Sequence, residues 1–156
     1  MTELVVIHGI SLPPGQYGGP EIEALFTNTL DPDAHPYFAE ISGLEVSAHF
    51  LLRRTGEVVQ FVSTDARAWH AGVSCWQGRE HCNDFSIGID LEGCDEEAYT
   101  DSQYVALNQL LAVLTKQYPD IRHDAIVGHS DIAPGRKTDP GPAFDWSRVV
   151  ASQSQQ

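Results

Sequence analysis

The residues best suited to bind a metal or catalyse a reaction are two histidines and one aspartate. Each histidine follows an apolar segment, and the aspartate lies in a loop with restricted backbone freedom. His8 comes directly after the apolar run Leu4–Ile7, and His129 follows a second short run at 125–127. Asp139 lies further along the same C-terminal loop, whose prolines and glycines restrict the backbone. Neutral imidazoles and a carboxylate are ligands of catalytic zinc sites, which keep one coordination position open. The three residues therefore indicate a site for one Zn²⁺ ion.

The two histidines can meet only if their segments are neighbouring strands. Parallel neighbours place their carboxyl ends at one edge of the sheet, where α/β proteins usually bind ligands. Asp139 would then fold back across Pro134 and Gly135. An alternative stays open, because a single histidine at a strand end is more often a hydrogen-bonded core residue. The spacing also matches no short zinc signature.

Two acids and a lysine are candidates to assist hydrolysis at such a site. The segment Ser86–Glu92 alternates, with apolar side chains on one face and Asp90 and Glu92 on the other. Acidic side chains are rarely buried on a central strand unless they have a partner or a function. We therefore expect one of them to face a cleft and exchange protons. Lys137 is close enough to Asp139 in sequence to stabilise an oxyanion. The alternatives are a solvated sheet face and an ordinary exposed lysine.

Composition narrows the class of protein. The chain of 156 residues has 22 acidic and 9 basic residues and a formal net charge of −13, which argues against nucleic acid or an anionic membrane as partner. We expect one globular domain, residues 1–156. No apolar run approaches the ~20 residues of a membrane span, and no export signal is recognisable. The 3 cysteines lack metal-binding or disulfide spacing. These features predict a soluble, cytoplasmic, monomeric protein.

The order of apolar patterns predicts an α/β domain with a central mixed β-sheet flanked by α-helices. We expect strands at 4–7, 46–52, 58–62, 66–71, 86–92 and 125–127, with a hairpin turn at 53–57. Helices are expected at 21–30 and from a capping box at Thr100 to Pro119, with 31–43 irregular. His49 and His70 fall within apolar strands and are interpreted as structural residues.

Six stretches, in order along nearly the whole chain, carry a family resemblance. They are Val6–Gly15, Asp31–Phe38, Val46–His49, Arg67–Ser74, Asn83–Gly93 and Gly128–Trp146. Together they resemble the AmpD family of 1,6-anhydro-N-acetylmuramoyl-L-alanine amidases, relatives of the peptidoglycan-recognition proteins. The resemblance implies that fold, a zinc cofactor held by His8, His129 and Asp139, and a catalytic role for Lys137. It also implies a small-molecule substrate, an anhydro-muropeptide cleaved at its lactyl–L-Ala amide during cytoplasmic peptidoglycan recycling.

Position 90 departs from the family pattern, which has a glutamate where this chain has Asp90. Aspartate is shorter by one C–C bond, about 1.5 Å. We nevertheless expect Asp90 to act as the general acid and base, with the backbone compensating. Trp69, Arg79 and Glu92 are expected to contact substrate, although core packing is an equal alternative for Trp69.

Two other functions stay open at this stage. The shorter acid is compatible with a catalytically weak module that binds or senses muropeptides. An amidase acting on intact cell wall, an autolysin or a phage lysin, is the second alternative, and the apparent lack of an export signal disfavours the autolysin.

Overall fold

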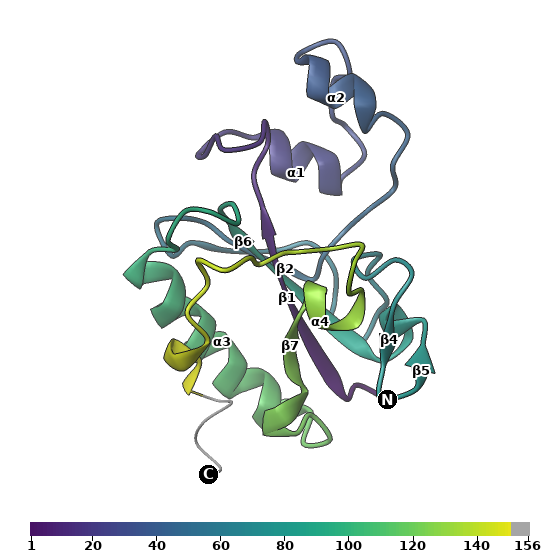
Figure 1. Cartoon of the computed structure of the whole chain (residues 1–156), viewed down its shortest axis with the longest axis vertical. Coiled ribbons are helices and arrows are strands. Elements are labelled where there is room, and N and C mark those ends of the chain that lie inside the picture. Colours follow the sequence, from purple (N-terminus) through teal and green to yellow (C-terminus); the bar gives the residue numbers. More distant parts are fainter. Residues whose placement is uncertain (151–156) are drawn as a thin grey trace.

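The computed structural model describes residues 1–150 and contains a five-stranded sheet in the order β3-β2-β6-β1-β7 (Figure 1). The two longest strands, β1 (Leu4–Ile10) and β6 (Ser86–Glu92), pair in parallel at its centre. Two short strands pair with them in parallel, β7 (Ile126–Gly128) with β1 and β2 (Phe50–Leu52) with β6. The edge strand β3 (Val58–Gln60) runs antiparallel to β2. The predicted mixed sheet is confirmed.

Helices lie on both sides of this sheet and beyond one end of it (Figure 1). The long helix α3 (Asp101–Gln117) packs along one face and begins with the predicted capping box at Thr100. The short helix α4 (His129–Ile132) follows β7 directly. Past the carboxyl end of β1 lie α1 (Glu21–Phe26) and α2 (Pro36–Glu40). The described residues also form three short 3₁₀ helices: η1 (Cys82–Asp84), η2 (His123–Ala125) and η3 (Trp146–Arg148).

Alternation along β1 and β6 divides the core between the two faces of the sheet. On the α3 face, Val5, Ile7 and the three apolar residues of β6 form a buried cluster with the helix. On the other face, Leu4 and Val6 belong to a second cluster. Both faces of β1 are covered, as its continuous apolar run predicts.

The register across the sheet places the predicted ligands and the predicted general base side by side. His8 on β1 is the partner of Asp90 on β6, and Ile7 is the partner of Gly128, the residue before His129. Register partners on adjacent parallel strands point to the same face. His8, Asp90 and His129 therefore meet at the carboxyl edge, on the face opposite α3. The condition for the two histidines to meet is therefore fulfilled, since β1 and β7 are parallel neighbours.

Several predicted boundaries were wrong. Helix α1 ends at Phe26 instead of residue 30, because Asn28 has φ of 60° and cannot continue a helix. Helix α2 lies in a segment predicted to be irregular, with the His35 side chain accepting a hydrogen bond from the Tyr37 amide. The segment 66–71 forms no strand, and β2 begins only at Phe50. A small two-stranded sheet, β4 (Cys75–Trp76) with β5 (Arg79–Glu80), was not predicted.

The described residues contain no helix with the length and apolar character needed to cross a bilayer. Of the single domain expected over 1–156, residues 151–156 lie outside the described part of the chain.

Candidate metal centre and active-site cleft

The three predicted metal ligands converge at the carboxyl edge of the sheet. His8 and His129 are buried, with exposed fractions of 4% and 5%, and their Nδ1 atoms lie 3.0 Å apart. Asp139 reaches back to both: its Oδ2 is 3.3 Å from His8 Nδ1 and its Oδ1 is 3.2 Å from His129 Nδ1. One nitrogen or oxygen atom from each side chain lies within 4.8 Å of the others.

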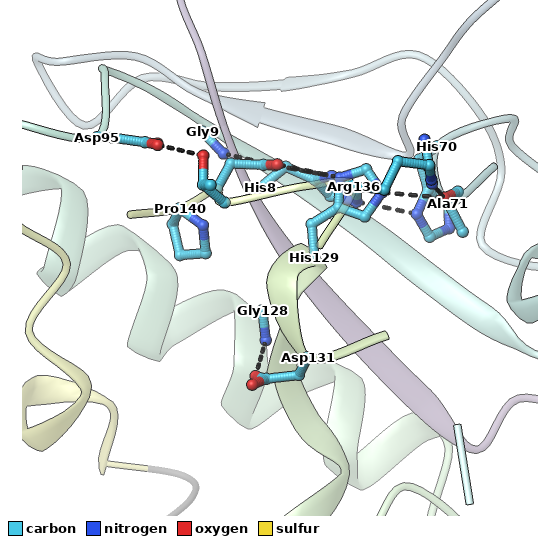
Figure 2. A network of polar contacts seen from close by, with 12 residues as sticks. His8, Gly9, His70, Ala71, Asp95, Gly128, His129, Asp131, Arg136 and Pro140 are labelled. Carbon is cyan, nitrogen blue, oxygen red and sulfur yellow. Dashed lines mark hydrogen bonds and ion pairs between the residues drawn. The ribbon is translucent and has the colours of Figure 1, made fainter. Parts of the chain in front are cut away.

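The hydrogen bonds behind the imidazoles determine which nitrogens face the cluster. His129 Nε2 lies 2.9 Å from the carbonyl oxygen of Ala71, so Nε2 carries the proton and donates it (Figure 2). The His8 Nε2 atom lies 3.0 Å from His70 Nδ1. With the His8 proton assigned to Nε2, both Nδ1 atoms present lone pairs to Asp139. Burial, more than any neighbouring charge, lowers the pKa of His8 and favours this neutral form.

This donor set fits a zinc ion. With these tautomers, two imidazole lone pairs and a carboxylate point at one another, and a cation between them would satisfy all three acceptors. A tetrahedral zinc ion with bonds of about 2.0–2.1 Å holds its ligands about 3.3 Å apart. The distances between the ligand atoms of His8, His129 and Asp139, 3.0–3.3 Å, are close to that spacing.

Asp139 is fixed by the backbone on either side. Its carbonyl oxygen accepts the Ser130 amide at 3.0 Å, and its Oδ2 lies 3.4 Å from the Gly9 amide. Burial favours its neutral form, but the close interactions with the His129 and His8 rings outweigh burial and hold the pKa of Asp139 well below the usual value. Asp139 is therefore an anion in this site, as a metal ligand must be.

Asp90 lies beside this cluster and is 6% exposed. Burial is the main cause, and the charge of Asp139 the second, of a pKa raised well above the usual range. A carboxylate with a raised pKa is a better proton acceptor than one at the surface. Asp90 is therefore a buried carboxylate with a raised pKa that lines the same cleft as the cluster.

Lys137 belongs to the same wall of the site. The turn that carries it is closed by hydrogen bonds from the amides of Arg136 and Lys137 to the carbonyl of Ala133. Its side chain is exposed and lines the cleft that contains His8. It therefore presents a positive charge from the solvent side of the cluster.

The cleft has a volume of about 550 Å³ and joins the polar cluster to an apolar wall. Its polar floor contains the cluster together with Asp90 and Lys137. The opposite wall consists of apolar residues from α1, α2 and the segment that follows, among them Phe26, Tyr37 and Ile41. Such a cleft suits a substrate that carries both polar groups and a nonpolar surface.

Of the three residues expected to contact substrate, only Trp69 lines the cleft. Trp69 is 55% exposed and also borders a neighbouring pocket of about 750 Å³, so it is not a core residue. Arg79 pairs with Glu3, and its guanidinium lies 3.9 Å from the centre of the Phe85 ring, outside the cleft.

Glu92, the third expected contact, is 1% exposed and forms a buried ion pair with Arg53 at 3.0 Å. It also accepts the amides of Gly18 and Arg54. Glu92 is thus an anchor for two loops, and Asp90 is the acid of the pair that faces the cleft.

Sequence reasoning missed one residue of the site. His70 was interpreted as structural, whereas its ring contacts the predicted ligand His8. His49, given the same interpretation, does have a structural role, since Nδ1 accepts the Gly88 amide and Nε2 donates to the Ala66 carbonyl. No signal in the sequence indicates this contact, because His70 follows Trp69 in a segment that forms no strand and therefore has no alternation pattern to orient it.

Comparison with known proteins identifies the class. Residues 2–142 match the N-acetylmuramoyl-L-alanine amidase family. The chain belongs to this family of amide hydrolases, and the resemblance seen in its motifs is confirmed. Within the family it is similar to AmpD. It is 67% identical over 148 residues to the 1,6-anhydro-N-acetylmuramyl-L-alanine amidase AmpD of Enterobacter cloacae, covering 95% of this chain and 79% of that protein.

Solved structures agree with this placement. The crystal structure of a Se-Met AmpD derivative has a TM-score of 0.94 and 62% identity, and the match covers 97% of this chain and 84% of that one. AmpDh3 from Pseudomonas aeruginosa, solved in complex with anhydromuramic pentapeptide, has a TM-score of 0.76 and 30% identity. That match covers 97% of this chain and 60% of the other.

Proposed function

We propose that this chain is a zinc-dependent amidase that hydrolyses the amide between the lactyl group of 1,6-anhydro-N-acetylmuramic acid and the L-alanine of the stem peptide. The observation that carries the proposal is the convergence of His8, His129 and Asp139 beside Asp90 and Lys137 in one cleft. The similarity to AmpD of Enterobacter cloacae, a 1,6-anhydro-N-acetylmuramyl-L-alanine amidase, supports the substrate. AmpDh3, solved with anhydromuramic pentapeptide, supports the same chemical class.

Three residues would hold the ion: His8 and His129 through Nδ1, and Asp139 through its carboxylate. Zinc in a three-ligand protein site supplies a Lewis acid for a carbonyl and makes water more acidic. The protein residues around it supply proton transfer, charge and orientation.

Asp90 is the proposed general base and acid. Its carboxylate takes a proton from the water that attacks the lactyl carbonyl carbon, and the C–N bond then breaks as Asp90 returns that proton to the alanine nitrogen. The products are the anhydro-sugar acid and the free peptide, so one water is consumed. The position of Asp90 beside His8 in the sheet favours this role, because β-strands hold side chains more rigidly than loops.

Lys137 is proposed to stabilise the negative charge that develops on the carbonyl oxygen as water attacks. An ammonium group fixed at that position lowers the energy of the tetrahedral transition state more than that of the planar substrate. The exposed aromatic face of Trp69 is proposed to contact the sugar or the peptide at the rim.

The setting proposed for the enzyme is cytoplasmic peptidoglycan recycling, with a monomeric protein and no nucleic-acid or membrane partner. The net charge of −13 supports the absence of a nucleic-acid or membrane partner, since nucleic acids and anionic membranes are themselves negatively charged.

Mass spectrometry of anhydro-N-acetylmuramoyl-tripeptide incubated with zinc-loaded protein tests the proposal, beside a sample treated with a chelator. Free tripeptide and anhydro-sugar, formed only with metal, are expected. Intact substrate in both samples, with zinc bound, would favour the binding or sensing module instead. Purified sacculi form the third sample, and faster release of peptide from sacculi than from the small substrate would favour an amidase of intact cell wall.

A further inference from the structure

The two histidines of the cluster are held from behind by consecutive residues of one segment. His8 Nε2 lies 3.0 Å from His70 Nδ1, and His129 Nε2 lies 2.9 Å from the carbonyl oxygen of Ala71. In Figure 2, His70 and Ala71 lie together on the same side of the cluster. A ligand imidazole is oriented by the hydrogen bond of its other nitrogen, so this short segment can orient both.

This segment has no strand partners and is held by side chains. Asn83 Oδ1 accepts the amides of both His70 and Ala71, at 3.1 and 2.9 Å. Arg136 donates to the Ala71 carbonyl at 2.7 Å and to the Val73 carbonyl at 2.9 Å. By fixing the backbone of both residues, Asn83 positions the two groups behind the ligands, His70 Nδ1 and the Ala71 carbonyl oxygen.

The ring of His70 is itself fixed in orientation. It packs on Gly88 so closely that a Cβ added there would lie 2.4 Å from the His70 Cγ. His70 Nε2 lies 3.1 Å from the hydroxyl of Ser86, and the His70 and His8 rings meet edge to face at 5.1 Å. Both ring nitrogens of His70 are therefore engaged, one by Ser86 and the other by His8.

We propose that His70 is a positioning residue for the metal centre. It accepts the Nε2 proton of His8 and thereby keeps the His8 Nδ1 lone pair directed at the ion, as the Ala71 carbonyl does for His129. His70 is not a ligand, because neither of its nitrogens is free. The inference rests on the proposed metal centre of His8, His129 and Asp139, and adds a buried acceptor that aligns one of its ligands.

Two substitutions of His70 separate its hydrogen bond to His8 from its hydrogen bond to Ser86. In His70→Asn the amide oxygen occupies the place of Nδ1, so the acceptor for His8 is kept and the contact with Ser86 is lost. In His70→Gln the amide reaches the place of Nε2, so the contact with Ser86 is kept and the acceptor for His8 is lost. The two amide side chains have similar polarity, and each variant keeps one of the two hydrogen bonds of His70 and loses the other.

The measurement is zinc affinity of the full chain, by competition with a chromophoric chelator, together with the visible spectrum of the Co²⁺-loaded protein. We expect His70→Gln to weaken zinc binding by about 10–100-fold and to change the Co²⁺ spectrum. His70→Asn should stay within a few-fold of the unchanged protein in affinity and keep its spectrum. His35→Asn, which alters a histidine in the cap of α2, serves as control and should leave both unchanged.

Unchanged zinc affinity in His70→Gln would overturn the inference, and so would equal weakening in both His70 variants. If the unchanged protein binds no zinc, the proposed metal centre fails first, which is a distinguishable result. Should His70→Gln not fold, Asn83→Leu and Asn83→Asp provide the second test. Leucine removes the acceptor for both amides and should weaken zinc binding, whereas aspartate keeps it; equal affinity in these two would overturn the inference.

Discussion

Asp90 is the register partner of His8, so the proposed general base and a proposed metal ligand lie side by side on the parallel strands β6 and β1. The pairing of the two strands therefore fixes the proposed proton acceptor next to the proposed ligand. A shorter carboxylate can serve there if the strand brings it to the cluster, and the burial of Asp90 on the His8 face is consistent with that role.

Asp90→Asn should abolish most turnover and leave zinc binding in place. The amide has nearly the same shape as the carboxylate but cannot take a proton, and general acid–base groups contribute about 10²–10⁴-fold to rate. Steady-state kinetics and metal content on the same preparation check this. Glu96→Gln removes a negative charge from an exposed residue of the same cleft and is the matched control. If the two variants lose equal activity, Asp90 acts only through its charge.

Lys137→Ala should retain zinc and lose kcat by roughly 10²–10³-fold, the range found when one oxyanion-stabilising donor is removed. The chain offers a matched control, because its other lysine, Lys116, is exposed in the last turn of α3. Lys116→Ala should leave kcat unchanged. A kcat for Lys137→Ala within a few-fold of the unchanged protein would remove the oxyanion role.

Zinc should stabilise the protein against unfolding, and His8→Ala should not respond. An ion that binds only the folded state adds about 2.7 kcal/mol to the free energy of unfolding at a hundred times its dissociation constant. Thermal unfolding of chelator-treated protein, repeated at increasing zinc concentration, measures the effect. A His8→Ala protein that is fully active without bound zinc would contradict the whole metal-dependent mechanism.

Glu92→Gln should lower stability and spare the metal. The carboxylate is buried against Arg53, and breaking a buried ion pair destabilises by about 3–5 kcal/mol; we expect the lower end because Glu23 also pairs with Arg53. Denaturant unfolding gives the change in the free energy of unfolding, and zinc titration of the folded variant should match the unchanged protein. A loss of zinc affinity without loss of stability would place Glu92 in the site after all.

The parts of the fold carried by regular alternation could be predicted from sequence. The period of two in Ser86–Glu92 placed Asp90 and Glu92 on the face opposite the apolar residues of the strand, and the capping box at Thr100 located the start of α3. Helix α2 escaped prediction because it is short and is nucleated by a histidine cap instead of a common capping residue.

The convergence of His8, His129 and Asp139 could be predicted because two of them follow apolar strands and the third lies in a stiff loop close to His129 in sequence. The contacts of Arg79 and His70 could not be predicted, since they depend on tertiary partners. Arg79 pairs with Glu3, and His70 is located by Asn83 through a contact that no local pattern encodes.

Because β1 pairs with β7, the proposed metal centre can be completed only after nearly the whole chain has been synthesised. Its ligands come from the first strand and from residues beyond 128, so a nascent chain that has not yet supplied Asp139 lacks the complete set. Binding of an ion at the proposed centre would thereby be coupled to docking of the C-terminal segment onto the N-terminal strand. A bound ion would then indicate that the first strand and the C-terminal loop have packed together.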